Sequence, residues 1–125
     1  MALKVLLVDD QLHAIHLLSM LLGVNGCETR GVTQGEEALR VAADWRPHAI
    51  CVDLDMPVMN GYELTSRLRK IEAAANVRIV AVSSSTADQE LLESAGIDLH
   101  VLKPVSIYEL RRALLQPLAH STAVN

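Results

Sequence analysis

Carboxylates, a lysine and a serine stand directly after short apolar runs of this sequence, where they could handle a phosphoryl group. Asp9 and Asp10 follow the first such run, and Asp53, Ser83 and Lys103 follow later ones. Phosphoryl transfer requires oxygen ligands for a metal, a fixed positive charge and hydrogen-bond donors. A carboxylate can itself act as the nucleophile and form an aspartyl phosphate. These residue types therefore point to phosphoryl chemistry, provided that the fold brings them together.

Three clustered aspartates would be unfavourable without a cation. Two carboxylates about 5 Å apart repel by roughly 3 kcal/mol at an effective dielectric constant near 20. Such repulsion raises a carboxyl pKa or calls for a positive ion. Oxygen ligands alone suit a hard ion. We expect Mg²⁺, because it binds through one or two carboxylates and keeps waters for a phosphate partner; Mn²⁺ is the second ion considered.

The elements that would position these residues alternate between strands and helices. Short, largely apolar runs predict strands over residues 3–8, 48–52, 77–82 and 98–102, and residues 27–32 are a weaker strand candidate. Amphipathic patterns predict helices over residues 11–22, 34–45, 62–74, 86–95 and 106–115. This alternation favours a parallel sheet covered by helices on both faces. The acids would then meet at the carboxyl edge of the sheet if the first and third strands are neighbours.

Four motifs in order carry a resemblance to a known family. They read VLLVDD, VDLDMPVMNG, VAVSSS and LHVLKP, and together they resemble the response-regulator receiver domain of two-component signalling. The likeness covers about residues 3–116. It implies a flavodoxin-like, doubly wound α/β fold with a five-stranded parallel sheet in the order 2-1-3-4-5 and five helices. We therefore expect a receiver domain over 1–116, followed by a loose C-terminal tail over 117–125 that shows no periodicity.

The resemblance implies a phosphoacceptor and a metal site. Asp53 would accept a phosphoryl group from a phosphohistidine. Asp10 would bind Mg²⁺ directly, and Asp9 would bind it directly or through water. Asp53 and the backbone carbonyl of Asp55 would complete the protein ligands. The side chain of Asp55 is expected to tune how water attacks the acyl phosphate.

The remaining family positions concern phosphate recognition and switching. Lys103 would pair with a phosphoryl oxygen, and Ser83 would donate a hydrogen bond to another. The bond from Lys103 to Pro104 is commonly cis in the family, and Gly61 would shape the loop after the acceptor. His100 departs from the pattern, since the family has Tyr or Phe there as a ring that moves when the hydroxyl does. Imidazole is smaller and titratable, so the switch is expected to be weaker, pH-sensitive or transmitted mainly by the backbone.

The implied partners are a sensor histidine kinase or a histidine phosphotransfer protein, with an unknown output partner or fused output domain. Phosphorylation would shift the surface of the fourth helix, fifth strand and fifth helix. The chain would turn over no substrate beyond slow self-phosphorylation and autodephosphorylation. A net charge of −4 with scattered basic residues argues against nucleic-acid binding by this domain. Apolar runs are far shorter than the ~20 residues of a membrane span, and no signal peptide is evident, so we expect a cytoplasmic protein.

Rival interpretations stay open at this point. Asp53 and Asp55 form a D-x-D pattern that resembles haloacid-dehalogenase-type phosphatases, although the motif lies mid-chain. His100 leaves room for an interaction module that no longer uses phosphate. Asp9 or Asp10 could simply cap the first helix.

Two further residue pairs have structural explanations. Cys27 and Cys51 are expected to be reduced thiols, because the fold would place a strand between theirs and hold them too far apart for a disulfide. His13 and His16 lie three residues apart on the first helix. We expect them to face solvent or a partner rather than to bind a metal.

Overall fold

Five parallel strands form the central layer of the computed structural model, which describes residues 2–115. They are β1 (Leu3–Val8), β2 (Cys27–Val32), β3 (Ala49–Asp53), β4 (Arg78–Ser83) and β5 (Leu99–Leu102). Their order in the sheet is β2-β1-β3-β4-β5. The predicted doubly wound topology is confirmed, including the adjacency of the first and third strands on which the convergence of the acids depends.

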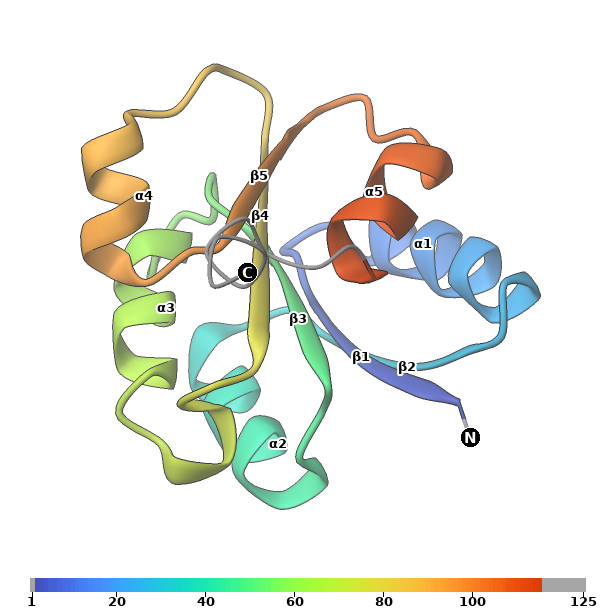
Figure 1. Ribbon diagram of the computed structural model, residues 1–125, viewed down its shortest axis with the longest axis horizontal. Helices are drawn as coiled ribbons and strands as arrows, with labels where there is room; N and C mark the ends of the chain where they lie inside the picture. The colour runs from blue at the N-terminus through green and yellow to red at the C-terminus, as the bar shows by residue number, and fades with distance from the viewer. Residues whose placement is uncertain (1, 116–125) are drawn as a thin grey trace, which may run out of the picture.

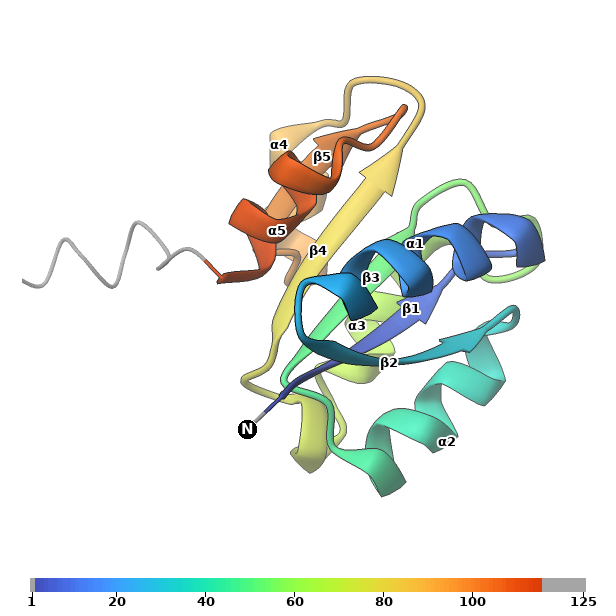
Figure 2. The ribbon, with the colours of Figure 1, turned by 90° about the vertical axis from the view of Figure 1, so that its right-hand side faces the viewer.

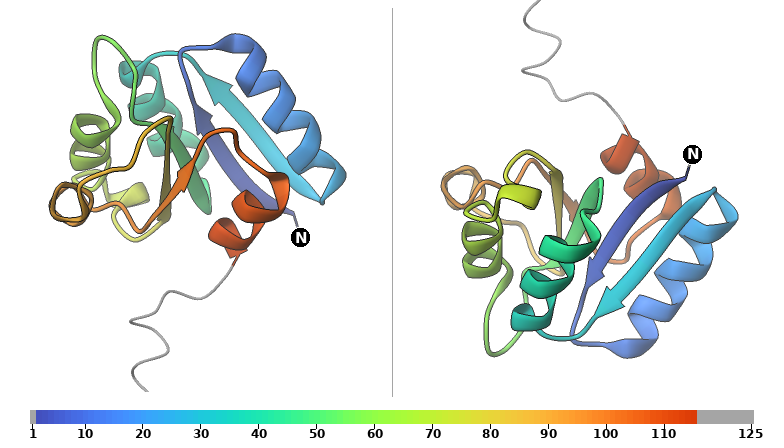
Figure 3. Two further views of the ribbon diagram at one scale, coloured as in Figure 1. Left: turned by 90° about the horizontal axis from the view of Figure 1, so that it is seen from above. Right: turned by 90° about the horizontal axis from the view of Figure 1, so that it is seen from below.

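Helices cover both faces of this sheet. They are α1 (Leu12–Val24), α2 (Gly35–Trp45), α3 (Gly61–Leu68), α4 (Gln89–Ala95) and α5 (Ile107–Leu115), with a 3₁₀ turn, η1 (Glu72–Ala74). Helices α1 and α5 lie on one side of the sheet, and α2, α3 and α4 lie on the other (Figure 1). Figure 2 views the α1 and α5 side, and the end-on views of Figure 3 show the sheet between the two helical layers. The direction of strand addition reverses at β1, so right-handed crossovers send α1 and α2 to opposite faces.

The core lies on both faces of the sheet, as the interior strand β1 shows. Val5 and Leu7 belong to the cluster beneath α1 and α5. Leu6 and Val8 belong to the cluster beneath α2, α3 and α4. All four side chains are at most 2% exposed. A strand buried on both faces must be apolar at every position, which explains the unbroken apolar run that precedes Asp9.

The predicted helix over 62–74 is wrong at its C-terminal end. Helix α3 ends at Leu68, and the following amides bond three residues back, from Lys70 to Arg67 and from Ile71 to Leu68. Ile71 is extended, so the chain leaves the helix before η1 begins. These shorter-range bonds tighten the last turn.

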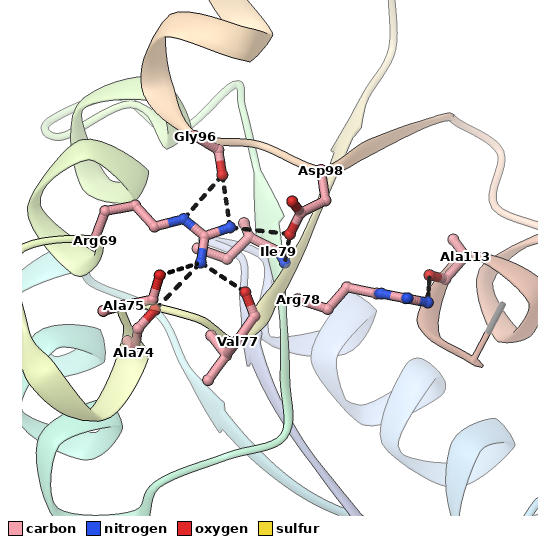
Figure 4. A network of polar contacts seen from close by, with 9 residues as sticks. All are labelled: Arg69, Ala74, Ala75, Val77, Arg78, Ile79, Gly96, Asp98 and Ala113. Atoms are coloured by element: carbon pink, nitrogen blue, oxygen red, sulfur yellow. Dashed lines mark hydrogen bonds and ion pairs between the residues drawn. The ribbon is translucent and has the colours of Figure 1, made fainter. Parts of the chain in front are cut away.

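Arg69 explains why the chain turns there (Figure 4). Its guanidinium donates to the carbonyl oxygens of Ala74, Ala75, Val77 and Gly96, at 2.6–3.3 Å. It also pairs with Asp98 at 2.9 Å, and the same carboxylate oxygen accepts from the amide of Ile79. A planar guanidinium with five donors can satisfy several carbonyls at once. Arg69 therefore fastens α3, the start of β4 and the end of α4 together at the edge of the sheet opposite the acids.

Helix α4 begins later than predicted, at Gln89 rather than near residue 86. Its N-cap is Asp88, whose side chain accepts a hydrogen bond of 2.8 Å from the amide of Glu90. An aspartate cap satisfies a backbone donor that the first turn leaves unpaired. The loop between β4 and α4 is correspondingly longer, and it borders the candidate site.

Other predictions concern the cysteines, the chain end and membranes. Cys27 on β2 and Cys51 on β3 are both free, and β1 lies between their strands, as expected. The predicted tail over 117–125 lies outside the described residues. Within residues 2–115, no helix has the length and apolar character needed to cross a membrane.

Candidate functional site

Three aspartates converge at the carboxyl edge of the sheet. Asp9 and Asp10 follow β1, and Asp53 is the last residue of β3. One carboxylate oxygen from each lies within 4.8 Å of the others. Asp9 and Asp53 are 7% and 3% exposed, whereas Asp10 is exposed. The predicted convergence is therefore present, with two acids buried and the third facing solvent.

Lys103 supplies a positive charge to this cluster. Its Nζ lies 3.5 Å from Oδ1 of Asp53, and its side chain is 33% exposed. Its backbone amide donates to the carbonyl of Ser83 at 2.8 Å, which fixes the end of β5 against β4. The bond from Lys103 to Pro104 is cis, as expected.

The environment of Asp9 favours its protonated form. Burial raises the pKa of the Asp9 carboxyl, and the charges of Asp53 and Asp10 raise it further. The amide of Gln11 and the ammonium of Lys103 lower it in part. The potential metal ligands are all oxygen atoms, and the one lysine offsets only part of the negative charge of the three acids. Such a site fits a hard divalent cation. The residues present therefore suit Mg²⁺ or Mn²⁺.

Asp9 does not serve merely as a helix cap. The N-cap of α1 is Gln11, which makes no side-chain capping bond. Oδ1 of Asp9 accepts the Gln11 amide at 2.8 Å, but Asp9 itself lies two residues before the cap. This single bond uses only part of the acceptor capacity of a carboxylate. Asp9 can therefore stabilise the local turn and still take part in the acid cluster.

The loop after β3 holds Asp53 in place. Oδ1 of Asp53 accepts a bond of 2.9 Å from the amide of Asp55. At the start of α3, a Cβ on Gly61 would lie 2.8 Å from the Asp53 carbonyl oxygen and 2.9 Å from Cα of Leu54. Backbone atoms that close exclude any side chain, so the glycine permits α3 to begin directly against the segment that carries Asp53.

Ser83 lies at the carboxyl end of β4, but its hydroxyl is bonded to its own loop and to β5. Its Oγ donates to the carbonyl of Ser85 at 2.7 Å and lies 2.7 Å from Nε2 of His100. Ser83 is 3% exposed and pairs with Leu102 in the sheet register. Burial lowers the pKa of the His100 imidazole, and the charge of Asp55 opposes this effect. The contact between Ser83 and His100 was not foreseen from the sequence.

The side chain of Asp55 contacts the loop after β4. Its Oδ2 accepts from the amide of Ser84 at 3.2 Å and from the Ser84 hydroxyl at 3.3 Å. The sequence led us to expect that this side chain influences hydrolysis, but Ser84 was not identified as its partner. The predicted ligand role of the Asp55 carbonyl stays a prediction.

Helix α1 carries exposed apolar and imidazole side chains beside the acids. Leu12, Leu17 and Met20 are 56%, 55% and 65% exposed. His13 and His16 are also exposed. A cavity of about 260 Å³ separates part of α1 from the acid cluster; its lining includes Leu17, Leu18, Leu21, Asp53 and Lys103. An apolar surface thus adjoins the candidate reaction site.

Comparison with known proteins identifies relatives of this chain. The family model described as the response regulator receiver domain matches residues 5–115. The transcriptional regulatory protein PrrA of Mycobacterium tuberculosis is 35% identical over 107 residues, which are 86% of this chain and 46% of PrrA. The chain thus spans about half the length of that relative.

Two solved structures agree with the fold. Chemotaxis protein CheY4 of Vibrio cholerae superposes with a TM-score of 0.89 at 28% identity, covering 94% of this chain and all of CheY4. The receiver domain of sensor histidine kinase PA1611 from Pseudomonas aeruginosa gives a TM-score of 0.82 at 30% identity, covering 91% and 95%. That structure contains a magnesium ion coordinated in its active site cleft.

Proposed function

This chain belongs to the response regulator receiver domain family, and from that membership we propose that it accepts a phosphoryl group on Asp53. The observation that carries the proposal is the convergence of three carboxylates within 4.8 Å, with the ammonium of Lys103 3.5 Å from Asp53. Clustered acids with a raised carboxyl pKa at Asp9 suit a divalent ion and an incoming anionic group.

The reaction is a phosphoryl transfer between a phosphohistidine and a carboxylate. An oxygen of Asp53 attacks phosphorus, the P–N bond to the donor imidazole breaks, and that imidazole nitrogen takes up a proton. Asp9, Asp10 and Asp53 would hold Mg²⁺, together with the Asp55 carbonyl. When bound, the ion offsets the negative charge on the transferring oxygens.

The residues around Asp53 divide the remaining tasks. Lys103 already lies against the acceptor carboxylate and would pair with a phosphoryl oxygen. Ser83 would turn its hydroxyl from the Ser85 carbonyl to another phosphoryl oxygen. Such a movement would shift the loop after β4 and the surface of α4, β5 and α5, as a change in the populations of two states.

The proposed phosphodonor is a sensor histidine kinase or a histidine phosphotransfer protein. The exposed side chains of Leu12, Leu17 and Met20 on α1 offer an apolar contact beside the acceptor. The relatives include a transcriptional regulatory protein and the receiver of a sensor kinase. The output partner or fused output domain is therefore not fixed by membership of the family.

Intact-mass spectrometry with acetyl phosphate tests the proposal. In Mg²⁺ the wild type should gain the mass of one phosphoryl group, whereas the Asp53→Asn variant and the wild type in EDTA should not. Mn²⁺ should substitute for Mg²⁺. Glu28→Gln, which makes the same change of charge at an exposed position of β2, should behave as the wild type. No mass gain would instead support a phosphate-independent module, and turnover of p-nitrophenyl phosphate would support a phosphatase.

Asp55 offers a second measurement at the same site. Its carboxylate bonds Ser84 across the mouth of the site, so we propose that its charge influences how water reaches the acyl phosphate. The lifetime of the phosphorylated protein should differ between wild type and Asp55→Asn. Equal lifetimes would remove Asp55 from the account without affecting Asp53.

A further inference from the structure

The hydroxyl of Ser83 has two close polar neighbours and only one proton. Its Oγ is 2.7 Å from the carbonyl oxygen of Ser85 and 2.7 Å from Nε2 of His100. A carbonyl oxygen can only accept, whereas a neutral imidazole nitrogen either donates or accepts according to its tautomer. The direction of the Ser83 proton therefore depends on the tautomer of His100.

The contact with Ser85 decides this direction. Two oxygens at 2.7 Å with no hydrogen between them would repel each other, and Ser83 alone can supply that hydrogen. The Ser83 proton consequently lies toward Ser85. A lone pair of the Ser83 Oγ then points toward Nε2 of His100. At a distance of 2.7 Å, Nε2 must carry a proton of its own and donate it to this oxygen.

From these contacts we propose that His100 is a positioning residue for Ser83. Its Nε2–H group holds the serine oxygen through a lone pair and leaves the hydroxyl proton free to move from the Ser85 carbonyl to a phosphoryl oxygen. This inference rests on the proposed phosphoacceptor function and adds a role for a side chain that departs from the family's aromatic ring. A phenyl ring has no donor and could not hold the oxygen in this way.

The surroundings of His100 support a neutral, donating imidazole. Burial lowers its pKa, with the charge of Asp55 acting in the opposite direction. A ring that is neutral near pH 7 exists as one of two tautomers, and the Ser83 contact selects the one protonated at Nε2. His100 pairs with Ala81 across the sheet, so the hydrogen bond also joins the hydroxyl to β5 directly.

Nitrogen-15 NMR of the imidazole tests the starting geometry without phosphorylation. In the wild type above pH 7, His100 should show a protonated Nε2 and an unprotonated Nδ1. The Ser83→Ala variant should lose this preference. A wild-type ring protonated at Nδ1 would overturn the inference, whether or not Asp53 accepts phosphate.

Phosphorylation rates test the consequence. With acetyl phosphate and Mg²⁺, His100→Phe should slow the labelling of Asp53 by about five-fold, the effect of one lost hydrogen bond. His100→Gln places an amide donor at similar reach and should restore most of the rate. In a Ser83→Ala background, His100→Phe should have no further effect.

The outcomes separate this inference from the proposed function. If the wild type is labelled and His100→Phe labels equally fast, or slows labelling equally with and without Ser83, His100 does not act through the serine. If the wild type is not labelled at all, the proposed function fails while the NMR measurement still decides the hydrogen bond. Urea denaturation checks the folding of each variant, so a slow rate that comes from a misfolded His100→Phe is recognised by the lowered urea midpoint of that variant.

Discussion

Replacing Asp9 by asparagine should stabilise the protein without metal and weaken its response to metal. At 4.8 Å, two carboxylates repel by about 3.5 kcal/mol at an effective dielectric constant of 20 and about 0.9 kcal/mol in bulk water. Asp9 faces two such partners, Asp53 and Asp10, and Lys103 offsets part of the repulsion. Because Asp10 is exposed to water, we expect a net gain on the order of 1–2 kcal/mol.

The substitution is chosen to change charge and little else. Asparagine is similar in shape and keeps an oxygen that can accept the Gln11 amide, which now bonds Asp9 at 2.8 Å. Burial, the largest cause of the raised pKa at Asp9, also disfavours the charged form. Both effects therefore favour the neutral amide in the folded state when no cation is present.

Urea denaturation in EDTA measures the effect, followed by Trp45, the only tryptophan in the sequence, and by circular dichroism. The midpoint should rise for Asp9→Asn with the m-value unchanged. Mg²⁺ at ten times its dissociation constant should stabilise the wild type by about 1.4 kcal/mol and the variant by less. Glu28→Gln, on the exposed edge strand, controls for net charge.

Two results would refute the electrostatic reasoning. The first is an Asp9→Asn variant that is no more stable than wild type in EDTA. The second is an equal gain for Glu28→Gln, which would assign the effect to overall charge rather than to the cluster. A variant that responds to Mg²⁺ as fully as the wild type would remove Asp9 from the metal site.

Four other predictions follow from particular contacts. Thr65→Val should raise the free energy of unfolding by about 1 kcal/mol in urea, because the fully buried hydroxyl has no hydrogen-bond partner among the described residues. Arg69→Lys should lower it by about 2 kcal/mol or more, since one ammonium cannot replace the guanidinium's bonds. Gly61→Ala should lower stability and the acetyl phosphate labelling rate together, because its methyl group would lie within 3 Å of backbone atoms. Burial raises the pKa of Cys51 to about 12, so a thiol reagent at pH 8 should label half-buried Cys27 first and Cys51 only after unfolding.

The sequence predicted the acid cluster because its positions follow from the strand ends together with the strand order that the family resemblance implies. In a parallel sheet, residues that terminate neighbouring strands meet at one edge, so Asp9, Asp53 and Lys103 could be placed once the strand order was inferred. The same logic could not locate the end of α3. Arg69 stops that helix by bonding four carbonyls in two other segments, residues 74–77 and Gly96, and neither periodicity nor propensity reports such acceptors.

Contacts between loops were equally hidden from the sequence. Ser84 and Asp55 are 29 residues apart, and Ser83 and His100 are 17 apart. Each pair depends on the exact path of a loop after a strand, where alternating patterns end. The sequence identifies His100 as a departure from the family, but its contact with the hydroxyl of Ser83 depends on the path of the loop after β4 and could not be predicted.

The two ends of α4 are held very differently, and this difference decides where a movement of Ser83 can spread. At the C-terminal end, the Gly96 carbonyl accepts two bonds from Arg69, which is fixed to Asp98 as well (Figure 4). At the N-terminal end, α4 begins after an exposed loop in which Ser84 donates two hydrogen bonds, of 3.2 and 3.3 Å, to one oxygen of Asp55. Interfaces held by several bonds resist small displacements, whereas such a loop can change between discrete arrangements. A displacement at Ser83 is therefore expected to pass through this loop and through His100 into β5, with the far end of α4 acting as the fixed point.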